Sequence, residues 1–224
     1  YDRYLTRERA RLLRIQLNNE GAQGRFEVLA ALTRLRQLSL DPALVDQRYE
    51  GVGSAKIDLL CSHLEQIVPA GHQVLVFSQF VSFLERIDSA LKQRGISCLL
   101  LEGKTRKRGD VIAKFRRGEG SVFLISLKAG GVGLTLTEAD YVYIMDPWWN
   151  PSVEAQAINR AHRIGQSRAV NVYRLVAQDT IEEKVCQLQA HKQRLIDTVV
   201  DDVGDESTQR MDIDQLIELL GVGE

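Results

Sequence analysis

Residues 74–80 read Val-Leu-Val-Phe-Ser-Gln-Phe, a short apolar run followed by the polar side chains Ser78 and Gln79. Similar runs recur downstream and alternate with segments of helical spacing. Strands are expected over residues 74–77, 97–101, 121–126, 141–145 and 169–176. Short strands that are apolar on both faces and separated by helices are typical of a parallel sheet covered on both sides. The sequence therefore predicts one α/β domain.

Helices are expected on both sides of this domain. Apolar residues recur at helical spacing over 5–17, 26–38 and 54–68, and Asp41-Pro42 is expected to stop the second helix. After the last strand, Thr180-Ile181-Glu182-Glu183 has the form of a capping box and predicts a long helix to about residue 200. The expected organisation is a helical segment (1–53), the α/β domain (54–178), a long helix (179–200), and an acidic linker with a short helix (201–224).

The 224-residue chain has a net charge of −1, but this sum hides charged regions of opposite sign. Residues 101–117 hold seven basic and two acidic side chains, whereas residues 197–224 hold nine acidic side chains and one basic. This asymmetry fits a surface that binds a polyanion, and solvated helix faces are the alternative. No apolar run is longer than 141–145, so no membrane association is expected. The chain starts without methionine, so we expect a piece of a longer protein.

Several segments fall where strands are expected to end, the edge at which open parallel sheets bind ligands. Gly103-Lys104-Thr105 looks like the end of a phosphate loop, but Cys98 occupies the position of the required upstream glycine. A nucleotide phosphate loop is therefore disfavoured here. A contact to nucleic-acid phosphate and a solvated turn both stay open. The three cysteines are widely spaced, so no disulfide framework and no metal site is expected.

Two further segments combine glycine or tryptophan with polar neighbours. Residues 126–137, Ser-Leu-Lys-Ala-Gly-Gly-Val-Gly-Leu-Thr-Leu-Thr, allow close approach of backbone to a ligand, with Ser126 and Lys128 as phosphate donors. In Asp146-Pro147-Trp148-Trp149-Asn150-Pro151, an exposed tryptophan beside basic patches can stack on a sugar or base. A core position is the alternative, above all for Trp148.

The segment 156–166, Gln-Ala-Ile-Asn-Arg-Ala-His-Arg-Ile-Gly-Gln, is expected to be helical up to Gly165. Gln156, Arg160 and Arg163 then lie at i, i+4 and i+7 and share one helix face. Two guanidinium groups aimed in one direction suit a terminal phosphate on which charge develops. A solvated arginine stripe is the alternative.

In their order, the segments 74–80, 101–105, 126–137, 146–151 and 156–166 resemble helicase motifs IV, IVa, V, Va and VI. The sequence RAHRIGQ (160–166), followed by TIEEKV (180–185), is similar to the corresponding sequences of the Swi/Snf family of double-stranded-DNA-dependent ATPases within helicase superfamily two. The resemblance runs from about residue 1 to residue 220. It departs at Val132 and Thr135, where family members often carry Glu and Asn, and in a more basic motif IVa.

This resemblance implies a RecA-like three-layer lobe with a mostly parallel sheet, a helical segment before it and a brace-type helix after it. It implies that ATP and Mg²⁺ bind mainly to a first lobe that this sequence does not contain. Arg160 and Arg163 are then expected to act as arginine fingers, with Gln156, Gly131 and Gly133 beside the nucleotide. The residues implied to contact the backbone of double-stranded DNA are Ser78, Gln79, Gly103, Lys104, Thr105, Ser126, Lys128 and Trp149.

Three other readings stay open. They are the second lobe of a strand-separating helicase, a non-catalytic interaction scaffold, and a small nucleotide-binding protein that uses Gly103-Lys104-Thr105. The expected partners are double-stranded DNA and the N-terminal lobe of the same protein. A bacterial cytoplasmic, nucleoid-associated location is expected, or a nuclear one for a eukaryotic protein.

Overall fold

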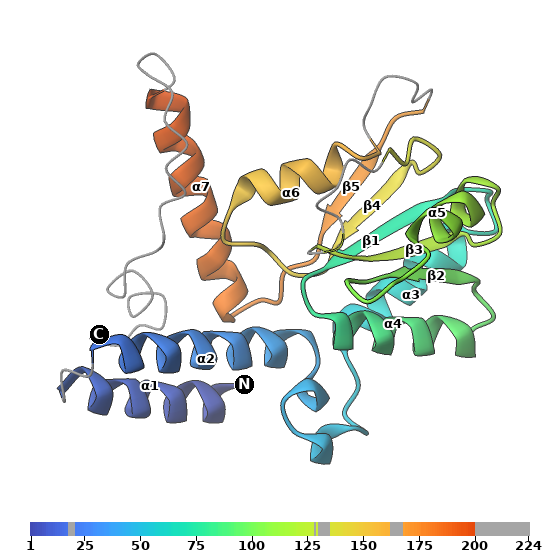
Figure 1. Cartoon of the computed structure of the whole chain (residues 1–224). Coiled ribbons are helices and arrows are strands. Elements are labelled where there is room, and N and C mark those ends of the chain that lie inside the picture. The colour runs from blue at the N-terminus through green and yellow to red at the C-terminus, as the bar shows by residue number, and fades with distance from the viewer. Residues whose placement is uncertain (18–20, 128, 130–134, 162–167, 200–224) are drawn as a thin grey trace. The chain divides into compact units, whose positions relative to one another are not determined.

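The computed structural model describes residues 1–17, 21–127, 129, 135–161 and 168–199 (Figure 1). The chain divides into two compact units. One consists of Tyr1–Ser39 with Ala177–Glu224, and the other is Leu40–Val176. The chain therefore passes between the units twice, at residues 39–40 and again at residues 176–177. The four-part division expected from the sequence stays a prediction.

The second unit is built on five parallel strands in the order β2-β3-β1-β4-β5. The strands are β1 (Val74–Ser78), β2 (Cys98–Leu101), β3 (Val122–Ser126), β4 (Tyr141–Ile144) and β5 (Asn171–Arg174). Val74 is level with Val122 on one side and with Tyr141 on the other, so the carboxyl ends of the central strands lie at one edge. This parallel sheet confirms the predicted α/β fold.

Helices cover both faces of this sheet (Figure 1). Helices α3 (Ala55–Ile67) and α4 (Val81–Gln93) pack on one face, and α5 (Arg108–Arg116) and α6 (Pro151–Ile158) pack on the other. Strand β1 is buried at every position, because its side chains alternate between the two faces of the sheet and helices cover both faces. Val74 and Val76 join the α3–α4 core, whereas Leu75 and Phe77 join the α5–α6 core. The continuous apolar runs of the sequence are explained by this double burial.

Capping side chains define where two helices of this unit, α3 and α6, begin. The Ser54 hydroxyl accepts a hydrogen bond from the backbone N–H of Ile57 (3.3 Å), and the Asn150 side chain accepts one from Ser152 N–H (3.0 Å). Each bond satisfies a backbone donor that has no partner within the helix. Pro151 occupies the first turn of α6, where its missing N–H costs nothing. The pair Asn150-Pro151 is typical of such a helix start.

The first unit contains helices α1 (Asp2–Leu17), α2 (Gly21–Leu40, reaching one residue into the second unit) and α7 (Ile181–Val199). Glu8 of α1 accepts two hydrogen bonds from Arg34 of α2, at 3.0 and 2.7 Å. The Tyr1 hydroxyl accepts one from the N–H of Ile181 (2.7 Å). Burial raises the pKa of this tyrosine to about 12.

The predicted ends of α2 and α7 can be compared with the observed ones. Helix α2 ends at Leu40, as Asp41-Pro42 predicts, and the chain continues in two 3-10 turns, η1 (Pro42–Leu44) and η2 (Gln47–Tyr49). At the start of α7, Thr180 accepts from Glu182 N–H (3.2 Å), whereas Glu183 reaches Asp179 N–H (3.0 Å) rather than Thr180. Each of the two capping bonds therefore comes from an N–H group one residue before the one that the predicted capping box uses. No described helix is long and apolar enough to cross a membrane.

Candidate nucleotide and nucleic-acid interface

The order of the strands creates a switch point between β1 and β4. From β1 the chain continues through α4 to β2 on one side, and from β4 it continues through α6 to β5 on the other. The loops that follow these two neighbouring strands therefore leave in opposite directions. Open parallel sheets bind ligands in the crevice that such a divergence creates at the carboxyl edge. Residues 78–80 and 145–150 lie at this edge.

Gln79 and Asp146 join the two loops at the switch point. The backbone N–H of Gln79 donates to Asp146 Oδ1 (3.2 Å), and the Gln79 side-chain amide donates to the same carboxylate. Asp146 is completely buried, so it accepts these bonds out of contact with solvent. Asp146 was not among the predicted site residues. Its position directly after a strand was the available signal, but only the fold shows that it faces Gln79.

Ser78 and Ser126 end β1 and β3, and both are buried. The Ser78 hydroxyl accepts a hydrogen bond from Phe80 N–H (3.1 Å), and the Ser78 carbonyl accepts one from Leu127 N–H (3.0 Å). These two hydrogen bonds fix the first residues of the loops that follow β1 and β3. A contact between DNA and this part of the edge would use the backbone here, because both side chains lie inside the unit.

The turn after β2 is closed on itself. Thr105 accepts a hydrogen bond from Glu102 N–H through its hydroxyl (3.0 Å) and donates its own N–H to the Glu102 carbonyl (3.1 Å). Two of the N–H groups that a phosphate loop would aim at its ligand are therefore used within the turn. Gly103 and Lys104 are exposed at its tip, which suits a contact to a phosphate from outside.

Two arginines of the basic region (residues 101–117) bind backbone carbonyls on either side of the glycine segment (residues 130–134). Arg108 Nη2 donates to the carbonyl of Ala129 (3.0 Å), and Arg116 Nη2 donates to the carbonyl of Thr135 (2.7 Å). Arg108 and Arg116 begin and end α5, so this helix binds the residues that flank positions 130–134 on both sides. The predicted residues Lys128, Gly131 and Gly133 lie outside the described residues. The basic region is thus in part a support for this segment and not only a solvated face.

The tryptophan pair is anchored by a buried carboxylate on α6. Glu154 accepts a hydrogen bond from Trp148 N–H (2.7 Å) through Oε1 and from Arg174 Nε (2.9 Å) through Oε2. Trp148 packs against the α5–α6 core, as its alternative reading proposed, and Trp149 is half-exposed. Glu154 was missed from the sequence, because nothing in its neighbourhood distinguishes it from a solvated helix residue.

The helix predicted to carry Gln156, Arg160 and Arg163 is shorter in the structure than in the prediction. It ends at Ile158, and Arg160 N–H bonds to the carbonyl of Ala157 in the turn that follows (3.3 Å). The predicted helix is therefore wrong at residues 159–161, and its remainder, residues 162–165, lies outside the described residues. Local spacing cannot foresee that the Arg160 carbonyl accepts from Leu136 N–H (2.9 Å), just after the glycine segment. Gln156 is exposed and the Arg160 side chain is buried, whereas Arg163 lies outside the described residues.

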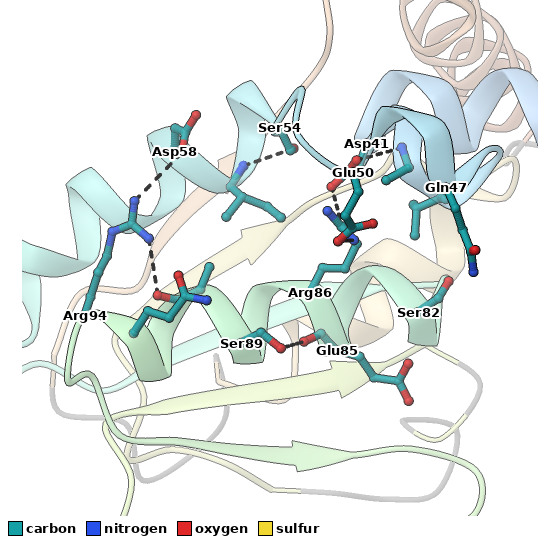
Figure 2. A pocket seen from close by; sticks show the side chains of 16 residues that line it. Asp41, Gln47, Glu50, Ser54, Asp58, Ser82, Glu85, Arg86, Ser89 and Arg94 are labelled. Carbon is teal, nitrogen blue, oxygen red and sulfur yellow. Dashed lines mark hydrogen bonds and ion pairs between the residues drawn. The ribbon is translucent and has the colours of Figure 1, made fainter.

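A pocket of about 720 Å³ lies among η1, η2, α3 and α4 (Figure 2). Arg86 of α4 spans it with ion pairs to Asp41 (2.5 Å) and Glu50 (2.7 Å). Burial alone would lower the pKa of Arg86, but these two pairs raise it above its usual value. None of the residues predicted to contact ATP or DNA lines this pocket.

Within the described residues, no group of three or more His, Cys, Asp or Glu side chains could hold a metal ion. Burial and a hydrogen bond to Asp88 raise the pKa of Cys98 to about 12, and burial also raises the pKa of Cys61. Both thiols are therefore protonated at neutral pH and are poor nucleophiles.

Comparisons with known proteins point to one family. Residues 55–165 match the helicase conserved C-terminal domain. The DNA repair protein RAD5B of Arabidopsis thaliana is 47% identical over 148 residues, which cover 64% of this chain and 12% of that protein. This chain therefore spans only a small part of that relative's length.

Two solved structures from Sulfolobus solfataricus share the fold. The SWI2/SNF2 ATPase C-terminal domain has a TM-score of 0.71 at 26% identity and covers 100% of this chain and 95% of its own. The SWI2/SNF2 ATPase core in complex with double-stranded DNA has a TM-score of 0.69 at 29% identity. The match covers 88% of this chain and 43% of that chain. Sequence motifs, fold and relatives agree: the chain belongs to the Swi/Snf family and is its RecA-like helicase C-terminal lobe.

Proposed function

We propose that this chain is the second motor lobe of an ATP-dependent double-stranded-DNA translocase. A first lobe holds ATP, and this lobe closes on it with Arg160 and Arg163 and supplies half of the track along the DNA backbone. One observation supports the proposal: the loops with the predicted DNA residues all follow strands of a single parallel sheet and therefore lie at its carboxyl edge. The same fold occurs in an ATPase core that was solved with double-stranded DNA.

The nucleotide role is divided between the two lobes. The turn at residues 102–105 uses its own N–H groups internally, so it cannot wrap a triphosphate. ATP and Mg²⁺ would therefore bind mainly to the first lobe. This lobe contributes exposed Gln156, the guanidinium groups, and the glycine segment that begins after Ala129.

The proposed DNA track consists of groups that suit a phosphate and sugar backbone. Lys104, Arg106 and Lys107 are exposed together after β2, and Trp149 is half-exposed after β4. Cations bind phosphates without regard to sequence, and an aromatic ring adds stacking on a sugar or base. The DNA would be held by its backbone with no reading of bases.

The test uses the complete two-lobed protein. Duplex DNA is expected to stimulate ATP hydrolysis, and the motor is expected to displace a triplex-forming strand while leaving a forked duplex paired. Separation of the forked duplex would favour a strand-separating helicase. Absence of DNA-stimulated hydrolysis in the complete protein would favour a non-catalytic scaffold.

The chain without its first lobe is expected to hydrolyse no ATP, because it lacks a loop that can bind the triphosphate. Release of phosphate is measured with and without duplex DNA on repurified protein. Turnover that copurifies with the chain, together with tight binding of a labelled ATP analogue, would support the self-contained nucleotide-binding protein instead.

Replacing Lys104 with alanine is expected to weaken duplex binding and to reduce the salt dependence of the affinity by about one unit, because one phosphate contact is lost. The affinity is measured across a series of salt concentrations. The same result is expected for Lys128→Ala. Lys92→Ala is the matched control, because Lys92 is exposed on α4 and is paired with Asp88 (2.5 Å). An unchanged slope for Lys104→Ala would place the DNA track elsewhere.

A further inference from the structure

A buried lysine, Lys56, lies in the first turn of α3 and has 6% of its surface exposed. Its ammonium group donates to the carbonyl of Met145 (2.6 Å) and to the carbonyl of Leu175 (2.8 Å). Met145 directly follows β4 and precedes the 146–150 loop, and Leu175 directly follows β5. One side chain therefore joins the ends of two neighbouring strands.

Lys56 does not stabilise α3, the helix in which it lies. A positive charge in the first turn is opposed by the helix dipole, which favours negative charge at that end. Burial of an ammonium group adds a desolvation cost. A methionine would avoid both costs but would leave the two strand-end carbonyls without this donor. The hydrogen bonds to Met145 and Leu175 are the feature that offsets the costs.

The position of these bonds in the chain is informative. The second unit begins at Leu40 and ends at Val176. The Ser54 hydroxyl, two residues before Lys56, donates to the carbonyl of Leu40 (2.5 Å), and Lys56 binds the carbonyl of Leu175. The first turn of α3 with its cap therefore holds the chain both where it enters this unit and where it leaves. The same turn holds the end of β4, which leads into the tryptophan loop.

We infer that Lys56 is a positioning residue that couples the 146–150 loop to the chain segment leading into α7. The inference rests on the proposed function, in which DNA contacts that loop. The backbone bond from Leu175 N–H to the Ile144 carbonyl (3.0 Å) already joins the two strands, and Lys56 adds a link from Leu175 to Met145 at the start of the loop. Through this added link, a displacement of the loop by DNA reaches residues 175–180. Without the ammonium group, DNA still binds the loop, but residues 175–180 no longer respond.

The test compares Lys56→Met with the wild type in the complete two-lobed protein by hydrogen exchange. In the wild type, duplex DNA is expected to slow exchange in residues 145–150 and in residues 175–180, each by about threefold or more. In Lys56→Met only the first segment is expected to slow. DNA-stimulated ATP turnover is expected to fall about tenfold, whereas turnover without DNA changes less than about twofold.

Two controls separate coupling from folding. Lys92→Met makes the same exchange of side chains at an exposed site on α4 and is expected to match the wild type. Lys56→Gln keeps a shorter donor and is used if Lys56→Met melts below the assay temperature. Slowing of both segments in the folded Lys56 variant, or an equal fall of turnover with and without DNA, would overturn the inference. A wild type in which DNA slows neither segment would instead contradict the proposed function.

Discussion

Replacing Arg160 with alanine is expected to lower the DNA-stimulated ATP turnover of the complete two-lobed motor by about a thousandfold. An arginine finger acts on the charge that develops on the transferred phosphoryl group, and its removal costs roughly 10³–10⁵ in rate. Duplex affinity is expected to change by less than about threefold, since in the proposed role this guanidinium stabilises a transition state and not the DNA complex. Steady-state turnover and duplex binding are measured on the same preparation. Arg163→Ala is expected to behave in the same way.

The burial of Arg160 makes its controls important, because only 8% of its surface is exposed. Arg160→Lys keeps the charge but loses the planar fork, and it is expected to stay at least about a hundredfold slower than the wild type. Arg117→Ala removes an exposed arginine that pairs with Glu119 (2.6 Å) and is expected to leave turnover unchanged. If turnover, duplex affinity and melting temperature fall together in Arg160→Ala, the residue is structural and the finger lies elsewhere.

Replacing Glu154 with alanine is expected to lower the free energy of unfolding by about 3 kcal/mol. The change removes the acceptor of Trp148 N–H and leaves Arg174 without this carboxylate. Breaking a buried pair by removing one partner costs about 3–5 kcal/mol, and the half-exposed Arg174 places the expected loss at the lower end. Urea denaturation of the chain measures this loss.

The matched control is Glu119→Ala, which also removes a carboxylate paired with an arginine, but at an exposed site. Its expected effect is small, because an ion pair between exposed side chains adds little to stability. Glu154→Gln keeps an acceptor for Trp148 N–H and is expected to lie between the two alanine variants. Equal losses for Glu154→Ala and Glu119→Ala would show that the buried carboxylate contributes no more than a surface pair.

The strands and most helices could be predicted because their signals are local. The run at residues 74–77 is apolar on both faces, so it predicts a covered central strand, and the structure confirms this with β1 over Val74–Ser78. The caps at Ser54 and Asn150 act within three residues of the helices they start. The Gly103-Lys104-Thr105 turn was separated from a phosphate loop by one missing glycine, which is also a local observation.

The end of α6 could not be predicted from the same signals. Residues 156–163 have helical spacing, yet the helix stops at Ile158. The carbonyl of Arg160 accepts instead from Leu136, 24 residues earlier in the chain. The helical pattern records the preference of a segment alone, and the tertiary hydrogen bond outweighs it. The shared face of Gln156 and Arg160 thus does not follow from sequence spacing.

By itself, the sequence determined the alternation of strands and helices, the family motifs and their order, and therefore which loops meet at the carboxyl edge. Tertiary structure alone decided the buried polar partners beneath those loops: Asp146 with Gln79, Glu154 with Trp148, and Lys56 with two strand ends. The carbonyls bound by Lys56 lie 89 and 119 residues away in the chain. Spacing specifies local conformation over a few residues, whereas partners this distant are chosen only when the whole sheet has assembled.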